Sequence, residues 1–176
     1  MGLDDREALL TVQALVDPAR GGDDAVGRFY TRWFAADLSA RDLFPPDLAA
    51  QRTAFSQALF WVLGEFIEQR AEEPVAFLAQ LGRDHRKYGV GHQHYAALQD
   101  ALLVTLRAEL GDRWDSRVAE ATTHAVDLIV GVMRGAAEAE QTPPYVDGNV
   151  VEHLRVTRDV SVVRLQLDQP LAYHAG

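Results

Sequence analysis

Hydrophobic residues recur at every third or fourth position along most of this chain, which is the spacing that places them on one face of an α-helix. The clearest case is a stripe of leucines four positions apart: Leu98, Leu102, Leu106 and Leu110. The pattern predicts seven helices with short connections, over about residues 4–16, 23–36, 37–44, 48–69, 72–85, 93–111 and 118–140. Because no strand pattern interrupts them, an α/β enzyme is excluded for this part of the chain.

Proline, glycine and acidic residues mark the ends of several of these helices. Pro18 stops the first helix. Asp23 and Asp24 are expected to cap the second. Pro74 is expected at the first helical position of the fifth, next to carboxylates that favour the positive end of the helix dipole. Gly111 is expected to end the sixth.

The pattern changes after Thr142-Pro143-Pro144. Two runs follow in which hydrophobic residues alternate with polar ones: Leu154 and Val156, then Val163, Leu165 and Leu167. Alternation of period two predicts a pair of β-strands, with Arg158-Asp159 as the turn between them. Two strands alone do not make a stable sheet. The chain stops at Gly176 within this pattern, so we expect the native protein to continue.

Composition narrows the classes of function. With 176 residues, 48% of them hydrophobic, the chain is long enough for one domain and an additional piece. The net charge of −9 and the scattered basic residues exclude nucleic acid as an expected partner. There is no cysteine, which excludes disulfides and fits a cytoplasmic location. No stretch approaches the roughly 20 apolar residues of a membrane span, and the acidic start of the chain does not look like a signal peptide.

Five short segments carry the candidate chemistry: Phe29-Tyr30, Leu43-Phe44, Gln51 to Phe55, His85 to Val90 and His94-Tyr95. In this order and spacing they resemble the haem pocket of bacterial flavohaemoglobins and their single-domain relatives. The resemblance covers roughly residues 1–140 and needs no gap across these positions. It implies an all-α globin fold, a three-over-three helical sandwich, with a short C-terminal β-strand pair or a disordered tail.

The resemblance implies haem b as the cofactor and His85 as the ligand of its iron, which needs a neutral imidazole. A single histidine is more often a surface or core residue, and the matched positions favour the ligand role here. His92 and His94 are nearby alternatives, but at a helix start they are expected to point to solvent. His124 has an ordinary packing explanation.

Tyr30 and Gln51 would form the distal side of the pocket by the same resemblance. Hydrogen-bond donors aimed at bound oxygen are charge-assisted, and each contributes about 1.5–3 kcal/mol. The alternative is a core tyrosine bonded to a carbonyl and a solvated glutamine in a first helical turn. Phe44 would pack on the porphyrin face and Phe55 would cap the iron, although both are equally plausible as plain core.

Tyr95 matches a family tyrosine that, together with a glutamate on the last helix, orients the proximal histidine and makes it a stronger electron donor. The ungapped position of that glutamate is Ala137, and Glu138 is the next residue. Asp84 stands where the family usually has lysine, and it would repel a haem propionate or accept a hydrogen bond near the ligand. These departures weaken the expectation of efficient nitric oxide dioxygenation.

The tail resembles the first strands of the FAD-binding barrel of ferredoxin-reductase-like flavoproteins, in which a Tyr-x-x-Gly segment such as Tyr173 to Gly176 leads to the flavin. We therefore expect a globin domain over 1–141, a linker over 142–148 and a truncated FAD-binding barrel over 149–176. Flavohaemoglobins join these two modules in that order.

The resemblance implies a haem-binding globin that binds O2 and acts as the haem domain of a flavohaemoglobin-type oxidoreductase. The intact protein would convert NO and O2 to nitrate, with electrons from NAD(P)H through FAD. O2, NO and CO are the expected ligands, and a reductase domain in cis or an external donor is the expected electron source. The alternatives are an O2-binding or storage globin and a haem-based oxygen sensor, neither of which is an enzyme.

Overall fold

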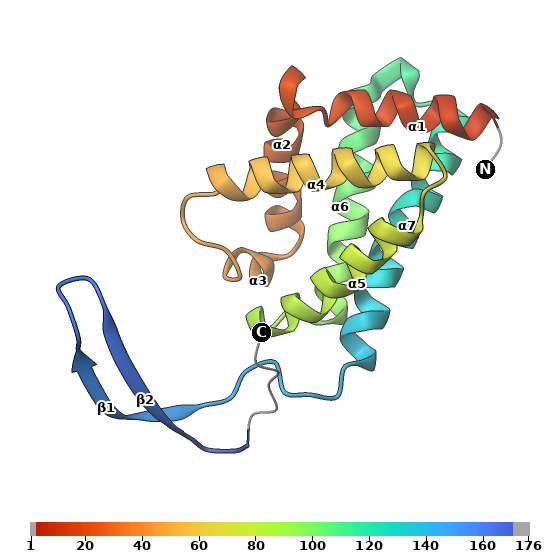
Figure 1. Cartoon of the computed structure of the whole chain (residues 1–176). Coiled ribbons are helices and arrows are strands. Elements are labelled where there is room, and N and C mark those ends of the chain that lie inside the picture. The colour runs from red at the N-terminus through yellow and green to blue at the C-terminus, as the bar shows by residue number, and fades with distance from the viewer. Residues whose placement is uncertain (1–2, 171–176) are drawn as a thin grey trace. The chain divides into compact units, whose positions relative to one another are not determined.

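The computed structural model describes residues 3–170, so Tyr173 and Gly176 of the predicted flavin segment lie outside the described residues. The chain forms two compact units that divide between Glu140 and Gln141. The first is entirely helical and the second contains both strands (Figure 1). None of the described helices is both long and apolar enough to cross a membrane.

The first unit confirms the expected all-helical fold. Its α-helices are α1 (Leu3–Leu15), α2 (Gly22–Ala36), α3 (Leu38–Arg41), α4 (Ala49–Ile67), α5 (Glu72–His85), α6 (His92–Leu110) and α7 (Ser116–Ala139). Short 3-10 turns η1 (Pro18–Arg20), η2 (Arg86–Tyr88) and η3 (Gly111–Arg113) join some of them. α1, α4 and α5 form one layer over α2, α6 and α7, which is the expected three-over-three sandwich (Figure 1).

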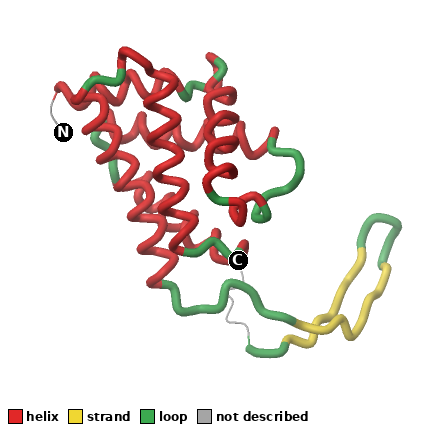
Figure 2. The backbone as a smooth tube through the Cα atoms, turned by 180° about the vertical axis from the view of Figure 1, so that it is seen from behind, coloured by secondary structure: helices red, strands yellow, loops and turns green. Residues whose placement is uncertain are grey.

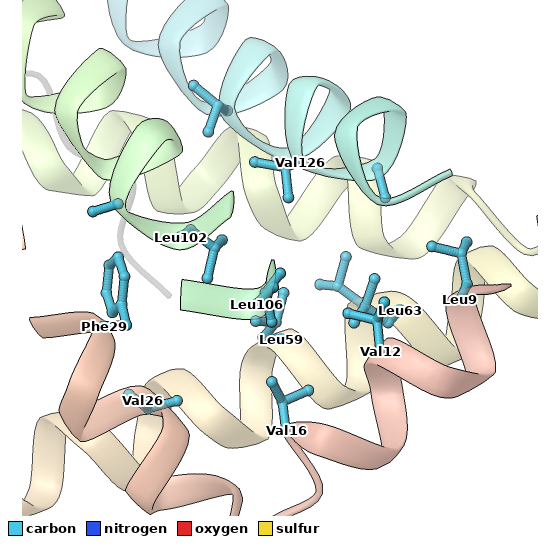
Figure 3. Packing of buried hydrophobic residues seen from close by; sticks show 14 of the residues in the cluster. Leu9, Val12, Val16, Val26, Phe29, Leu59, Leu63, Leu102, Leu106 and Val126 are labelled. Atoms are coloured by element: carbon cyan, nitrogen blue, oxygen red, sulfur yellow. The ribbon is translucent and has the colours of Figure 1, made fainter. Parts of the chain in front are cut away.

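The core lies between the two layers, where the hydrophobic stripes of the helices meet. Its buried side chains come from every long helix, with Leu78 contributed by α5, and Phe29 and Val12 are each only 1% exposed. Figure 3 shows ten of the core residues by name: Leu9, Val12, Val16, Val26, Phe29, Leu59, Leu63, Leu102, Leu106 and Val126. Burying each such side chain contributes about 1.5–3 kcal/mol, so this core holds α1, α2, α4, α5, α6 and α7 in place.

Local sequence explains most helix ends but not two of the expected ones. Gly111 ends α6 with φ at +54°, as expected of a glycine in a left-handed conformation. The expected capping of α2 by Asp23 and Asp24 is wrong, because Gly21 is the N-cap and both aspartates lie in the first turn. Pro74 is the third residue of α5 and not the first, because the helix already begins at Glu72.

The second unit is a two-stranded antiparallel hairpin of β1 (Gly148–Arg155) and β2 (Ser161–Leu167) (Figure 2). The predicted runs pair across it, with Leu154 opposite Val162 and Val150 opposite Leu165. The strands alternate in sequence as predicted, yet the side chains on both faces are exposed. Since a hairpin of this size buries too little to be stable by itself, its apolar side chains are available for further packing.

Candidate functional site

Three of the predicted site residues lie on two consecutive helices, α4 and α5, which separate as they leave their connection. α4 carries Gln51 and Phe55 near its start, and α5 carries His85 at its end. Trp61 and Phe77 meet edge to face near the connection, with their ring centroids 5.4 Å apart. Beyond them α4 packs on α1 and α2, whereas α5 packs on α7, and the two helices diverge (Figure 1). The distal and proximal candidates therefore lie at the ends of α4 and α5 that are farthest from this connection, which we call the open ends of the two helices.

His85 is the half-buried last residue of α5. Its Nδ1 lies 2.6 Å from the carbonyl oxygen of Leu81, one turn earlier. A carbonyl only accepts hydrogen bonds, so Nδ1 carries the proton and Nε2 keeps its lone pair. Histidine binds metals as a neutral ring through a nitrogen with a free lone pair, which here is Nε2. The bond from Nδ1 to the backbone also fixes the orientation of the ring.

Gly82 determines how closely α5 approaches α7. A Cβ atom added at this position would lie 2.7 Å from the carbonyl carbon of Met133 and closer still to its oxygen. The backbones of the two helices therefore touch at a point three residues before His85. Glycine is required for this contact, because any side chain would move α5, and His85 with it, away from α7.

Tyr95, near the start of α6, is buried and its hydroxyl has no hydrogen-bond partner among the described residues. Burial raises the pKa of this hydroxyl, and the negative charge of Glu138 raises it further. Glu138 is thus the carboxylate that acts on Tyr95, although its own ionic partner is Arg134 at 3.9 Å. The structure brings Tyr95 and Glu138 near one another without a bond between them.

Tyr30 and Gln51, the two predicted distal residues, lie together. Tyr30 in α2 is 2% exposed, and Gln51 is half-buried in the first turn of α4. Burial raises the pKa of the Tyr30 hydroxyl to about 12, and a hydrogen bond with the Gln51 side chain opposes this rise. The tyrosine is therefore a neutral hydrogen-bond donor at physiological pH.

An aromatic cluster surrounds Tyr30, and the structure places both other distal candidates in it. Its members are Phe29, Tyr30, Trp33, Phe34, Phe44 and Phe55. Phe44 meets Tyr30 edge to face at 5.4 Å, and Phe55 stacks on Phe29 at 5.1 Å. Phe44 and Phe55 remain half-buried, so each has an apolar surface left for a further group, and their contact with a porphyrin stays a prediction.

A polar junction that the sequence did not reveal holds the start of α4 against α2. Arg52 donates to the carbonyl oxygen of Asp23 from Nη2 at 2.8 Å and from Nε at 3.1 Å. The Thr53 hydroxyl donates to Asp23 Oδ2 at 2.7 Å. The guanidinium of Arg52 covers Gly27, where an added Cβ would lie 2.9 Å from Cζ. This junction fixes the neighbouring Gln51 relative to Tyr30.

The other histidines of the helical unit do not share the environment of His85. His92 is exposed, with Nε2 3.3 Å from Arg134. The expectation that His94 points to solvent is wrong, because it is 6% exposed and both ring nitrogens are bonded. His124 is exposed, so packing does not explain it. Among the described residues, no group of three or more histidine, aspartate or glutamate side chains is arranged to hold a metal ion.

Asp84, the departure beside His85, is exposed and interacts along its own helix. Its Oδ1 accepts a hydrogen bond from Gln80 Nε2 at 3.2 Å. Gln80 also accepts from Arg83, at 2.7 Å from Nη2. The carboxylate is therefore satisfied within α5, and its predicted effect on a haem propionate stays a prediction.

Comparisons with known proteins agree with this geometry. The globin family profile matches residues 27–133, more than half of the chain. The chain is 31% identical over 115 residues to leghemoglobin alpha of Phaseolus vulgaris and 26% identical over 115 residues to leghemoglobin of Psophocarpus tetragonolobus. Each match covers 61% of this chain and 79% of the relative.

Among solved structures, the chain is similar to a flavohemoglobin from Malassezia yamatoensis determined with bound FAD and heme. The TM-score is 0.72 at 16% sequence identity, which shows a shared fold. The match covers 99% of this chain, hairpin included, and this chain spans 48% of that flavohemoglobin.

Proposed function

This chain belongs to the globin family, and we propose from this that it binds haem b, with His85 as the iron ligand, and takes O2 as its physiological ligand. The observation that carries the proposal is the bond from His85 Nδ1 to the Leu81 carbonyl, which leaves Nε2 as the coordinating atom at the open end of α5. Gln51, beside the buried Tyr30, lies at the open end of α4.

The residues between the open ends of α4 and α5 fit a porphyrin. Half-buried apolar side chains remain along this region of the core, and they would cover the faces of a flat apolar ring: Phe44, Phe55, Leu81, Val90 and Leu98. The unpartnered hydroxyl of Tyr95 lies on the proximal side. Bound haem would supply ferrous iron, which takes diatomic ligands such as O2, CO and NO.

On the distal side, the side chains of this chain select and hold the ligand. The Tyr30 hydroxyl and the Gln51 amide are hydrogen-bond donors, and the pKa of about 12 keeps Tyr30 protonated. The ring of Phe55 and the aromatic cluster exclude water from this side. Dry surroundings strengthen each hydrogen bond made to a ligand there.

Hemin titration of the purified chain tests the ligand assignment. The wild-type protein is expected to develop a Soret band at one hemin per chain, and His85→Ala to lose it or to bind far more weakly. His92→Ala is the matched control, since His92 is exposed and seven residues away, and it should behave as wild type. A His85→Ala variant with a wild-type spectrum and affinity would show that another residue holds the iron.

The finer proposal is that this chain is the haem domain of a flavohaemoglobin-type oxidoreductase with nitric oxide dioxygenase activity. The match to a flavohemoglobin over 99% of this chain supports it. FAD and NAD(P)H would bind outside the 48% of that protein which this chain spans. A reductase domain in cis, or an external donor in the cytoplasm, would then supply the electrons.

The second candidate is an O2-binding globin or sensor without enzymatic activity. The residues at the predicted proximal positions favour it. Within residues 3–170 the Tyr95 hydroxyl has no hydrogen-bond partner, and Ala137 cannot provide the carboxylate that the enzyme family uses at its position. Mixing the oxygenated ferrous chain with NO and measuring nitrate discriminates between the two. Turnover with an added reductase supports the enzyme, whereas a single slow oxidation per haem supports the binding protein.

A further inference from the structure

His94 is a buried histidine that the proposed function does not use. It is the third residue of α6 and is 6% exposed. The N–H of Gly91 donates to its Nδ1 at 2.9 Å. Its Nε2 lies 3.3 Å from the Ser39 hydroxyl, which donates in turn to Asp37 Oδ1 at 2.6 Å. We call these four residues the His94 link.

The two ends of the His94 link belong to opposite sides of the candidate site. Gly91 ends the turn that starts directly after His85, and it is the N-cap of α6. Asp37 caps α3, and its carboxylate accepts from the N–H groups of Ser39 and Ala40. α3 leads within a few residues to Phe44 of the aromatic cluster. One side chain therefore connects the segment after the proximal ligand with the segment before the distal phenylalanine.

The bonding pattern specifies one protonation state of His94. Nδ1 accepts from Gly91, so the proton of the neutral ring is on Nε2, which donates to the Ser39 oxygen. An imidazolium ring is a donor at both nitrogens. Protonation would therefore break the bond to Gly91 and keep the bond to Ser39, because Nε2 is a donor in both protonation states.

We propose that His94 is a positioning residue for haem retention, which holds the turn after His85 to α3 while it is neutral and releases the Gly91 side when it is protonated. This inference rests on the proposed haem site. Histidine is the side chain that ordinarily changes charge between about pH 5 and 8, so haem is retained less well toward the acidic end of that range.

The charged groups on the elements around the start of α6 do not replace His94 in this role. They are Asp37 and Arg41 from α3, Arg134 and Glu138 from α7, and Arg86 and Lys87 from η2. Arg41 is engaged by the carbonyls of Phe44, Pro45 and Pro46. Arg134 and Glu138 pair with each other, and Lys87 Nζ lies over the Tyr88 ring. Asp37 is the group whose charge interacts with His94.

Transfer of hemin from the loaded chain to excess apomyoglobin, measured at about pH 8 and about pH 5.5, tests the proposal. His94→Phe removes both bonds and should release hemin about three- to tenfold faster at the higher pH. His94→Asn keeps an acceptor near the Nδ1 position and should restore most of the wild-type rate. Ser39→Ala removes only the longer of the two His94 bonds, together with the bond from Ser39 to Asp37, and should have the smaller effect. Circular dichroism verifies that each variant is folded.

The pH profile separates positioning from simple packing. Acceleration of hemin release between the two pH values should be larger in the wild type than in His94→Asn, because asparagine does not titrate. Effects of pH on the rest of the haem site are common to both proteins and cancel in the comparison. Equal pH profiles in the wild type and His94→Asn, or wild-type release by His94→Phe, would overturn the proposal.

Hydrogen exchange of the Gly91 amide in the chain without hemin tests the His94 link separately from the proposed haem site. The His94 link predicts slow exchange in the wild type and His94→Asn, and fast exchange in His94→Phe. If the chain takes up no hemin, the proposed function fails while this amide still reports on the link. If hemin binds but the Gly91 amide exchanges at the same rate in all three proteins, the link is wrong and the haem site stands.

Discussion

At the scale of single residues, hydrogen bonds decide what each candidate side chain is able to do. The carbonyl of Leu81 fixes the proton of His85 on Nδ1 and leaves Nε2 for a metal. Burial, opposed by the interaction with Gln51, keeps Tyr30 protonated. The same reasoning weakens the predicted role of Tyr95 in orienting His85, because the Tyr95 hydroxyl is hydrogen-bonded to neither His85 nor Glu138.

Replacing Tyr30 with phenylalanine should speed the release of O2 from the ferrous chain. The substitution keeps the ring and its packing but removes a charge-assisted hydrogen bond of about 1.5–3 kcal/mol, or roughly ten- to a hundredfold in rate. Stopped-flow displacement of O2 by CO measures the effect. Tyr145→Phe, at an exposed tyrosine of the hairpin unit, should release O2 as the wild type does. An unchanged rate in Tyr30→Phe would remove Tyr30 from the distal side.

Alkaline titration should show that Tyr30 ionises late. Its pKa is raised from 10.0 to about 12, so the folded state binds this proton more tightly than the unfolded state does. The resulting stability is present below pH 10 and is lost as the pH rises toward 12. Comparing ultraviolet tyrosinate absorbance of the wild type and Tyr30→Phe, the two curves should coincide up to about pH 11 and differ above it. A difference already at pH 10 would contradict the burial of this hydroxyl.

The sequence indicated candidate site residues, whose roles stay predictions, but not the residues that hold them. Tyr30, Gln51 and His85 were indicated by their order in the chain. Arg52 and His94 were not, because their roles depend on Asp23 and Ser39, which lie 29 and 55 residues away in sequence. A histidine at a helix start is normally solvated, whereas this one is buried and bonded to Ser39 of α3.

At the scale of elements, the site depends on how closely two helices approach. The hydrophobic period predicted α5 and α7 correctly, yet a glycine inside a helix indicates only a local cost of about 1 kcal/mol. The structure shows the gain that offsets this cost, which is the direct contact between Gly82 and the Met133 backbone. The incorrect Asp23 cap has a similar cause: the carboxylate bonds to Thr53 of α4 instead of its own helix end.

Gly82→Ala should destabilise the helical unit and weaken hemin binding. The added methyl group cannot fit against α7, and overpacking of this kind costs about 1–3 kcal/mol, which exceeds the gain of up to about 1 kcal/mol in helix propensity. Urea unfolding and hemin titration measure both effects. Gly135→Ala in α7 is the control, because nothing lies within 4 Å of an added Cβ there, and it should be neutral or stabilising. A stabilised Gly82→Ala variant would show that α5 does not need this contact.

At the scale of the whole molecule, the chain consists of a complete helical core and a hairpin without one. Apolar periodicity was sufficient to predict the helical unit, because each stripe had several partner helices. The strand pair was also predicted, but alternation gave no indication of what covers it, and its valines and leucines are exposed. The match to a flavohemoglobin covers 99% of this chain, and the start of an FAD-binding barrel in the hairpin stays a prediction.

Removing residues 141–176 should leave the globin unit intact. The division between Glu140 and Gln141 cuts neither a helix nor a strand, so residues 1–140 should keep the thermal midpoint and hemin affinity of the longer chain. The shortened protein should also associate less in light scattering, because exposed apolar strands promote pairing between molecules. Loss of hemin binding on truncation would show that the hairpin unit contributes to the haem site.

The central claim, a histidine-ligated haem that binds oxygen, is tested most directly by the visible absorption spectrum of the hemin-loaded chain after reduction, first alone and then under O2 and CO. The account predicts a five-coordinate ferrous spectrum that changes to a stable oxygenated form and to a CO form. A protein that takes up no hemin, or whose reduced form is unchanged by either gas, would contradict it.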